Sequence, residues 1–338
     1  MNNSSLRDTI AQEFVKSLNE NQLPWQSMWA SQRAYNATTG KNYTGINAMW
    51  LSYQALKKGY TDPRWCTFKQ AKDKGWHVKK DEKSTSVEFW SLYDTKTRKA
   101  ISMDEAEKIL QADPEREKDL SFISKKACVF NAEQISGIPQ LQQTTEVDIA
   151  AIRAQRDTLI KNMGLSFHEG GNQAFYRPSD DSITMPPDKT FKDDYGYMST
   201  LLHECGHATG HESRLNRDLS GRFGSESYAK EELRAEIASA FTSQALGFGA
   251  QGADLGAAMD NHKAYVQSWV KAIQDSPKEL FAAIKDAEKI SDYLIEKGEF
   301  KLPEKAAEIE QPALEEQIEG ARTVEQQKIH QKTPEWSR

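Results

Sequence analysis

The chain has 338 residues, of which 38% are hydrophobic and 28% charged, and a net charge of −6. This length allows a sizeable core and two domains. Its three cysteines, with no CxxC pair, exclude a disulfide scaffold and a cysteine zinc site and favour a reducing compartment. No apolar stretch approaches about 18 residues, and the N-terminus has no basic, apolar leader. We therefore expect no membrane span, no signal peptide and a cytoplasmic location.

The first half of the chain predicts a mixture of helices and strands. Apolar residues recur at helical spacing over 5–20 and predict an amphipathic helix. The pattern then predicts helices over 47–58 and 68–74, a strand over 86–93, a turn over 94–98, a charged helix over 103–119 and a strand over 126–131. Between residues 32 and 99 the sequence has 14 basic and 6 acidic residues, so this segment carries +8 and the remainder −14. The net negative charge of the whole chain argues against a polyanion as partner. The uneven distribution of charge nevertheless favours a module within the basic segment that binds a polyanion.

The second half predicts a separate α+β domain. Residues 140–147 are polar and predict a linker. After it the pattern predicts a helix over 148–162, strands over 165–167, 174–176 and 182–185, helices that begin near 194 and 228, and one or two helices over 259–297. Residues 304–338 are rich in Glu, Gln and Lys and predict a mobile charged tail. The predicted fold class is thus α+β, with a domain over 1–139, the linker, and a second domain over 148–303.

The second domain contains a zinc-hydrolase motif, His203-Glu204-Cys205-Gly206-His207. On a helix, His203 and His207 project to the same side, where two neutral imidazoles can bind zinc. Glu204 is then placed to act as the general base that takes a proton from water. Cys205 is expected to be a small buried helix residue rather than a ligand.

The third ligand is not fixed by the motif itself. A His six residues after His207 is excluded because that position is Ser213, and His211 lies too close along the helix. Glu232 and Glu236 share one face of the following helix, an arrangement that is similar to gluzincins. We therefore predict that Glu232 binds zinc and that Glu236 accepts a hydrogen bond from a ligating imidazole. Exchanged roles, or two glutamates on a solvated charged face, are the alternatives.

Beyond the motif, the chain resembles the ArdC-type antirestriction proteins of conjugative plasmids over roughly residues 5–300. The N-terminal likeness rests on Trp25, Asn36, Thr39-Gly40, Tyr43, Gly45-Ile46-Asn47, Gly59-Tyr60, Pro63-Arg64-Trp65, Thr67-Phe68, Gln70-Ala71, Gly75 and Val129-Phe130-Asn131. The C-terminal likeness rests on Asp181, Ile183, Pro186, the motif extended to Thr209-Gly210-His211, Arg214-Leu215, Arg217 and the segment Tyr228 to Glu236. The resemblance implies a domain that binds single-stranded DNA followed by a zincin-like metallopeptidase domain.

Basic and aromatic residues alternate in the first domain, as a single-stranded DNA site requires. Such sites combine phosphate contacts from Lys and Arg with base stacking on aromatic rings. The residues that we predict to contact DNA are Lys41, Tyr43, Lys57, Lys58, Tyr60, Arg64, Trp65, Lys69, Lys74 and Trp76. We expect residues 1–139 alone to bind single-stranded DNA with little sequence preference and strong salt dependence.

Two functions follow from these predictions. In the first, the protein binds single-stranded DNA and protects incoming plasmid DNA during conjugation, and its Zn²⁺ peptidase-type site acts on, or only docks, a host protein such as a restriction-system component. In the second, it is a zinc peptidase for DNA-associated proteins, and DNA binding only localises it. A structural zinc is a third interpretation, but such sites usually have four protein ligands. For an extended peptide substrate, Ile183 is a candidate for main-chain pairing.

Overall fold

The structure is a computed structural model that describes residues 5–25, 28, 32–142, 147–222, 224–247 and 255–305, with only the backbone described for 255–264. The predicted tail beyond residue 305 and residues 143–146 of the predicted linker lie outside these ranges. Apart from 137–142 and 304–305, the described residues form one compact unit. Among the described residues, no helix combines the length and the apolar character needed to cross a lipid bilayer.

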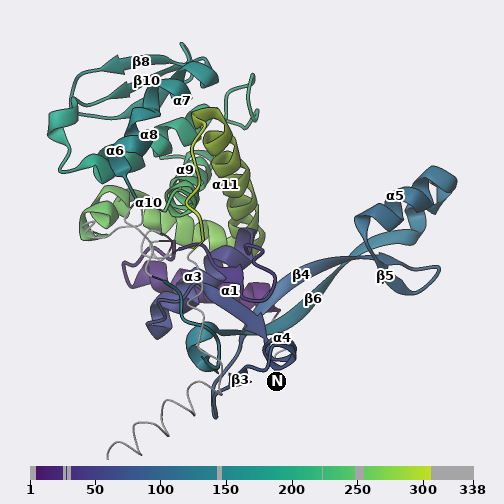
Figure 1. Cartoon of the computed structure of the whole chain (residues 1–338). Helices are drawn as coiled ribbons and strands as arrows, with labels where there is room; N and C mark the ends of the chain where they lie inside the picture. The colour runs from purple at the N-terminus through teal and green to yellow at the C-terminus, as the bar shows by residue number, and fades with distance from the viewer. Residues whose placement is uncertain are drawn as a thin grey trace, which may run out of the picture. The chain divides into compact units, whose positions relative to one another are not determined.

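The first half of the chain alternates short helices with strands (Figure 1). Its elements are α1 (Leu6–Asn19), β1 (Tyr35–Asn36), α3 (Gly45–Lys58), β2 (Arg64–Thr67), α4 (Phe68–Asp73), β3 (His77–Val78), β4 (Thr85–Asp94), β5 (Lys99–Ile101), α5 (Met103–Ala112), a 3-10 helix (Pro114–Asp119), β6 (Leu120–Asn131), a 3-10 turn (Ala132–Gln134) and β7 (Ile135–Ser136). Five strands form one sheet in the order β1-β2-β6-β4-β5, and β3 pairs with β7. The short strands β1, β2, β3, β5 and β7 are absent from the sequence prediction, because two to four residues give too little alternation to detect.

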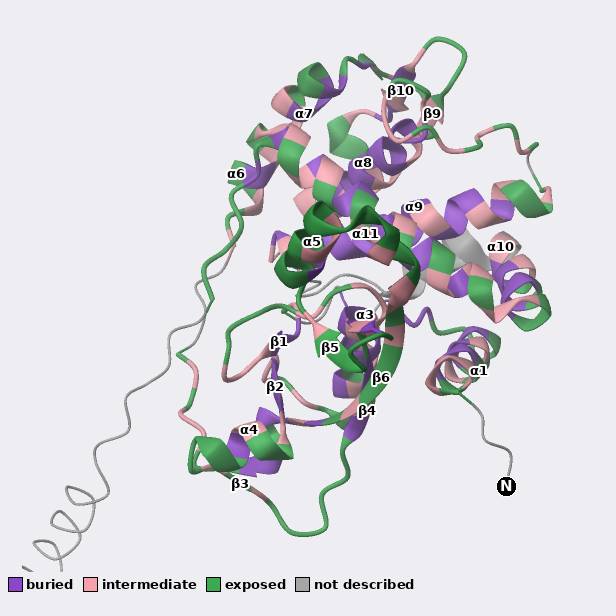
Figure 2. Cartoon of the chain, turned by 90° about the vertical axis from the view of Figure 1, so that its right-hand side faces the viewer, coloured by how far each residue is buried: buried purple, intermediate pink, exposed green. Residues whose placement is uncertain are grey.

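Strands β4 and β6 form the longest antiparallel pair, from Thr85 opposite Val129 to Asp94 opposite Leu120. Helix α5 follows beyond the far end of this pair and is mostly exposed, with Ala106 buried (Figure 2). The helix predicted over 103–119 ends at Ala112, and a 3-10 helix begins at Pro114. Proline at this position has no N–H to continue the α-helical ladder, which explains the break.

The second half contains a small sheet and six helices of the described chain. Its elements are α6 (Ile149–Ala154), α7 (Arg156–Met163), β8 (Ser166–Glu169), β9 (Phe175–Arg177), β10 (Ser182–Met185), a 3-10 turn (Asp188–Thr190), α8 (Asp194–Ala208), α9 (Glu226–Ala245), α10 (Leu255–Asp275) and α11 (Pro277–Gly298). The strand order is β8-β10-β9, with β10 parallel to β8 and antiparallel to β9. The predicted α+β class is confirmed, and the histidine and glutamate helices begin close to their predicted starts.

One hydrophobic core joins the two halves of the chain. Phe14, Trp25 and Trp50 from the first half lie in the same cluster as Leu201 and Phe241 from the second, and each is at most 6% exposed. Helix α1 contacts both α10 and α11. A smaller cluster under the five-stranded sheet includes Trp65 and Val129. The polar segment 140–147 therefore does not divide two independent cores, since α1 completes the core of the helices that carry the histidine motif.

Candidate functional site

The histidine motif occupies the last two turns of α8. The helix begins after Asp193, whose Oδ1 accepts a hydrogen bond from the N–H of Gly196 at 2.8 Å. Leu202 and Cys205 are fully buried, and this core contact fixes the rotation of the helix. As a result His203 and His207 face the same cavity, and their Nε2 atoms lie 3.1 Å apart. As expected, Cys205 is a buried residue of this helix.

Helix α9 brings Glu232 to the two histidines. Ser225 caps its start by accepting a hydrogen bond from the N–H of Tyr228 at 3.2 Å. Farther along, Ala235 lies against Gly206 of α8, where the missing side chain lets the helices approach. The Glu232 Oε1 lies 3.3 Å from His207 Nε2, and its Oε2 lies 3.6 Å from His203 Nε2.

The two imidazoles and the Glu232 carboxylate converge closely enough to bind one metal ion, since one donor atom of each lies within 4.8 Å of the others. Zinc binds imidazole nitrogen and carboxylate oxygen at about 2.0–2.2 Å, so neighbouring donors of a tetrahedron lie about 3.3 Å apart. The two Nε2 atoms lie 3.1 Å apart, Glu232 Oε1 lies 3.3 Å from His207 Nε2, and the other oxygen of the same carboxylate, Oε2, lies 3.6 Å from His203 Nε2. These are also the residues that form a metal-competent group among the described histidines, cysteines and acids. The donor set thus fits a divalent cation, with one position open toward the cavity.

Each imidazole also has a carboxylate behind it. Glu236 Oε2 lies 3.4 Å from His203 Nδ1, and Glu231 Oε1 lies 3.4 Å from His207 Nδ1. Both glutamates are under 10% exposed, as is Glu232, which excludes the solvated-face alternative. The structure places Glu232 on the Nε2 side of both rings and Glu236 on the Nδ1 side of one. This geometry favours Glu232 over Glu236 as the ligand.

Sequence reasoning missed Glu231 and the residue that holds it, Arg217. The Arg217 guanidinium donates to Glu231 at 2.6 and 3.1 Å, to Thr209 Oγ1 at 2.6 Å and to the carbonyl of Gly206 at 2.8 Å. One signal was available: two ligating imidazoles each need an acceptor, and Glu231 directly precedes Glu232 in the same helix. The long polar loop that carries Arg217 gave no indication of this contact.

The protonation of the cluster follows from these pairs. Burial by itself would lower the pKa of His207, but hydrogen bonds to Glu231 and Glu232 raise it to about 9. Burial likewise opposes the charge on His203, whose pKa is raised well above its ordinary value by Glu232 and Glu236. Burial would raise the pKa of Glu232, yet the two histidines hold it far below its usual range. A cation that binds here must therefore displace imidazole protons.

Glu204 lies beside the metal-competent group and is 8% exposed. Its Oε2 accepts a hydrogen bond from the backbone N–H of Tyr176 at 2.8 Å. This contact holds the carboxylate of α8 against strand β9. Glu204 lines the same cavity as the three candidate ligands, a cleft of about 1240 Å³ whose wall also includes Phe175 and Tyr228.

The structure corrects the predicted substrate strand. Ile183 lies in β10, the central strand of its sheet, and is fully buried. Because β8 and β9 pair with β10 on both sides, Ile183 has no free main-chain edge for a substrate. Strand β9 is the edge strand that lines the cleft.

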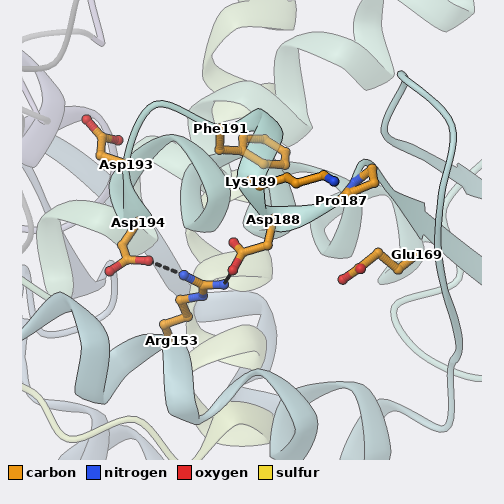
Figure 3. A pocket seen from close by; sticks show the side chains of 8 residues that line it. All are labelled: Arg153, Glu169, Pro187, Asp188, Lys189, Phe191, Asp193 and Asp194. Atoms are coloured by element: carbon orange, nitrogen blue, oxygen red, sulfur yellow. Dashed lines mark hydrogen bonds and ion pairs between the residues drawn. The ribbon is translucent and has the colours of Figure 1, made fainter.

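A second cavity, of about 720 Å³, adjoins the cleft and shares Phe191 and Asp193 with it. Its arginine, Arg153, is paired with Asp188 and Asp194 (Figure 3). The residues that line this cavity include neither histidine nor cysteine. We therefore assign the chemistry of the protein to the larger cleft.

The residues predicted to contact DNA do not form one exposed surface. Arg64 and Trp65 are each 1% exposed: the Arg64 guanidinium pairs with Asp62 at 2.7 Å, and the Trp65 ring packs against Tyr60. Neither can reach a DNA strand in this structure, so both are removed from the predicted set. The sequence shows that they are basic and aromatic but cannot show that β2 is covered.

The remaining predicted residues differ in exposure. Tyr43, Tyr60 and Trp76 are half-buried, whereas the exposed members of the set are Lys41, Lys57, Lys58, Lys69 and Lys74. Lys57 is already paired with Glu13 at 2.7 Å, and Lys58 lies over the Tyr60 ring. Sequence reasoning missed the exposed ring that precedes Lys69 in the chain, Phe68 at the start of α4, which is 58% exposed.

Comparison with known proteins accounts for both halves of the chain. The family model of the N-terminal domain of anti-restriction factor ArdC matches residues 4–130, and that of zincin-like metallopeptidases matches residues 154–286. The crystal structure of antirestriction protein ArdC from plasmid R388 is 30% identical and has a TM-score of 0.67. The match covers 88% of this chain and all of that one. The chain belongs to the ArdC antirestriction family. A second structure of the same ArdC protein, with Mn(II) bound, matches with a TM-score of 0.66.

Other relatives of this ArdC family member are longer or of unknown function. Two Escherichia coli proteins named DNA primase TraC are 42% identical over 297 residues and 39% identical over 330 residues. These matches cover 85% and 95% of this chain, which spans only 20% and 29% of the respective TraC proteins. The protein y4eC of Sinorhizobium fredii is 33% identical over 264 residues, which are 77% of this chain and 80% of y4eC.

Proposed function

We propose that this ArdC family member is a cytoplasmic antirestriction protein that binds single-stranded DNA and carries a zinc metallopeptidase-type site. In this role it protects incoming plasmid DNA during conjugation and acts on a host protein such as a restriction-system component. The observation that carries the enzymatic part is the convergence of His203, His207 and Glu232, with one donor atom of each within 4.8 Å of the others, beside the buried carboxylate of Glu204. The DNA-binding part rests on the family and on an exposed basic surface.

The residues of the cleft fit peptide hydrolysis. Zinc held by His203, His207 and Glu232 would polarise a peptide carbonyl and acidify water. Glu204, fixed by the Tyr176 N–H, takes a proton from water and passes it to the leaving amine. Strand β9 lines the cleft, and its edge is suited to an extended peptide that pairs with main-chain groups other than the Tyr176 N–H, which is bonded to Glu204.

The DNA-binding part centres on a surface that we call the α4 patch: Phe68, Lys69, Lys72 and Lys74. All four side chains are exposed, and the three lysines make no ion pair with a described residue. Phe68 and Lys72 lie one helical turn apart and so share a face. An exposed ring beside unpaired cations suits a single strand, whose bases stack while its phosphates are neutralised.

The second candidate function is a zinc peptidase for DNA-associated proteins, with DNA binding only for localisation. The cleft of about 1240 Å³ supports it, because that volume admits a polypeptide segment. The same cleft argues against a structural metal, since three protein donors and an open side characterise catalytic zinc sites.

A conjugation assay tests the proposal. A plasmid that carries restriction sites is transferred into a restricting host that contains the wild-type protein, Glu204→Ala or a Phe68→Leu variant. The proposal predicts protection by the wild type and weaker protection by both variants. No protection by the wild type, together with zinc-dependent cleavage of DNA-bound proteins, would support the peptidase function instead.

A further inference from the structure

Trp25 lies in the first half of the chain, but its side chain reaches the residues around the candidate metal site in the second half. It lies within the segment that matches the ArdC N-terminal domain and far outside residues 154–286, which match the zincin-like family. Its side chain is fully buried. The indole Nε1–H donates a hydrogen bond to Glu236 Oε1 at 3.4 Å.

Glu236 connects Trp25 to a candidate metal ligand. One oxygen of its carboxylate accepts from Trp25, and the other lies 3.4 Å from His203 Nδ1. The Nε2 atom on the opposite side of the same imidazole is the one that faces Glu232 and His207. The contacts from Trp25 to Glu236 and from Glu236 to His203 therefore connect the N-terminal segment to the donor atoms.

The position of the indole is fixed by its neighbours. Trp25 packs edge-on against Trp269, with ring centroids 5.4 Å apart. Trp269 in turn donates its Nε1–H to the carbonyl of Ala229 in α9 at 2.8 Å. Trp25 is thus held against the helix that carries both Glu232 and Glu236.

The contact has a physical consequence for Glu236. This residue is 4% exposed, and a buried carboxylate remains charged and oriented only while donors compensate for lost hydration. Removal of the Trp25 donor leaves the carboxylate less well held. Its hold on the His203 ring then weakens, although no ligand atom has been changed.

We propose that Trp25 is a positioning residue of the metal centre and acts on His203 through Glu236. The metal centre is then not confined to the zincin-like segment, because the N-terminal segment supplies one of its supporting hydrogen bonds. This inference rests on the metal site in the proposed function. It predicts that loss of the Trp25 N–H weakens metal binding by the full chain even when the fold is intact.

The test is a double-mutant cycle in the full-length protein with Zn²⁺ as the probe. Zinc affinity is measured by competition with a chromophoric chelator for the wild type, Trp25→Phe, Glu236→Gln and the double variant. Trp50→Phe is the matched control, because it also deletes a buried indole donor, in this case one that bonds to the carbonyl of Ser86. The midpoint of thermal unfolding of each variant without zinc reports any general loss of stability.

The expected result is a decrease of about 10-fold in zinc affinity for Trp25→Phe and no decrease for Trp50→Phe. In the Glu236→Gln background, Trp25→Phe should cause no further decrease. Equal affinity of Trp25→Phe and the wild type, or a full additional decrease in the double variant, would overturn the inference. If the wild type itself binds no zinc, the proposed function fails instead.

A second substitution covers the case in which Trp25→Phe does not fold. Benzothienylalanine at position 25 keeps the shape of the indole but replaces its N–H by sulfur. This variant retains the packing against Trp269 and removes only the donor to Glu236. It should show the same decrease in zinc affinity, and unchanged affinity in this variant would also refute the role of Trp25.

Discussion

The candidate metal site and the α4 patch differ in how far their residues could be recognised from the sequence. His203, Glu204 and His207 lie within five residues of one helix, so their common orientation follows from helical geometry alone. The DNA-contact residues were predicted from composition, and of these Trp65 and Arg64 are in the core. Chemistry that depends on local spacing can be read from a sequence, whereas a binding surface depends on which side chains the remainder of the fold covers.

The largest expected effect concerns the ligands of the cluster. His203→Ala and Glu232→Ala each remove one of three donors, so both should lose the stoichiometric zinc that the wild type retains. Glu236→Ala should keep zinc with affinity reduced about 10- to 100-fold, because it acts only through His203. Metal analysis after dialysis measures both effects. Loss of zinc in Glu236→Ala with retention in Glu232→Ala would exchange the two roles.

The next effect separates metal binding from chemistry. Glu204→Gln keeps the size of the side chain but cannot take a proton, so zinc content should be unchanged while proteolysis falls by about 10²- to 10⁴-fold. Cleavage of an unfolded protein substrate by the zinc-loaded chain is the assay. His211→Ala is the control and should have full activity. Undiminished cleavage by Glu204→Gln would eliminate this residue as the base.

The difference between the two regions extends to the supporting residues. Glu232 and Glu236 were both identified from their spacing on one helix, but spacing could not decide which faces the Nε2 atoms. Arg217 reaches the site from a loop, and Trp25 reaches it from the N-terminal segment. No local sequence pattern predicts contacts between such distant segments. The long strands β4 and β6 were predicted in part because their alternation extends over many residues, while short strands left no comparable signal.

A pH dependence of zinc affinity follows from the raised pKa values of the histidines. The pKa of His207 is about 9 in the folded chain against an ordinary value of 6.5, so between these values a proton must leave when zinc binds. Affinity should therefore rise with pH, by about 10-fold per unit for each proton displaced. Calorimetry in two buffers of different ionisation enthalpy counts these protons. Affinity independent of pH over this range would contradict the assigned cluster.

The stability of the zinc-free protein should change with pH in the opposite direction to the zinc affinity, so it should fall as the pH rises. Because the folded pKa of His207 is raised, its pairs with Glu231 and Glu232 contribute stability that is fully present below pH 6.5. That contribution is lost as the pH rises through about 9. Thermal unfolding of zinc-depleted protein as a function of pH measures this loss.

The smallest expected effect sharpens the account of the α4 patch. Phe68→Leu removes a stacking ring but keeps an apolar side chain, and single-stranded DNA affinity should fall about 10-fold. Phe122→Leu, at another ring that is 60% exposed, is the matched control and should change nothing. Fluorescence anisotropy with single- and double-stranded oligonucleotides at several salt concentrations measures both variants. A wild type that binds both forms equally, or without salt dependence, would remove the stacking model.

The most direct test of the central claim is zinc X-ray absorption of the zinc-loaded full chain. The spectrum should show two imidazole nitrogens at about 2.0–2.1 Å with oxygen donors in the remaining positions, as expected from His203, His207, Glu232 and solvent. The same spectrum of Glu232→Ala should lose the zinc signal. A sulfur scatterer at about 2.3 Å, which would implicate Cys205, or a third imidazole, which would implicate His211, would contradict it.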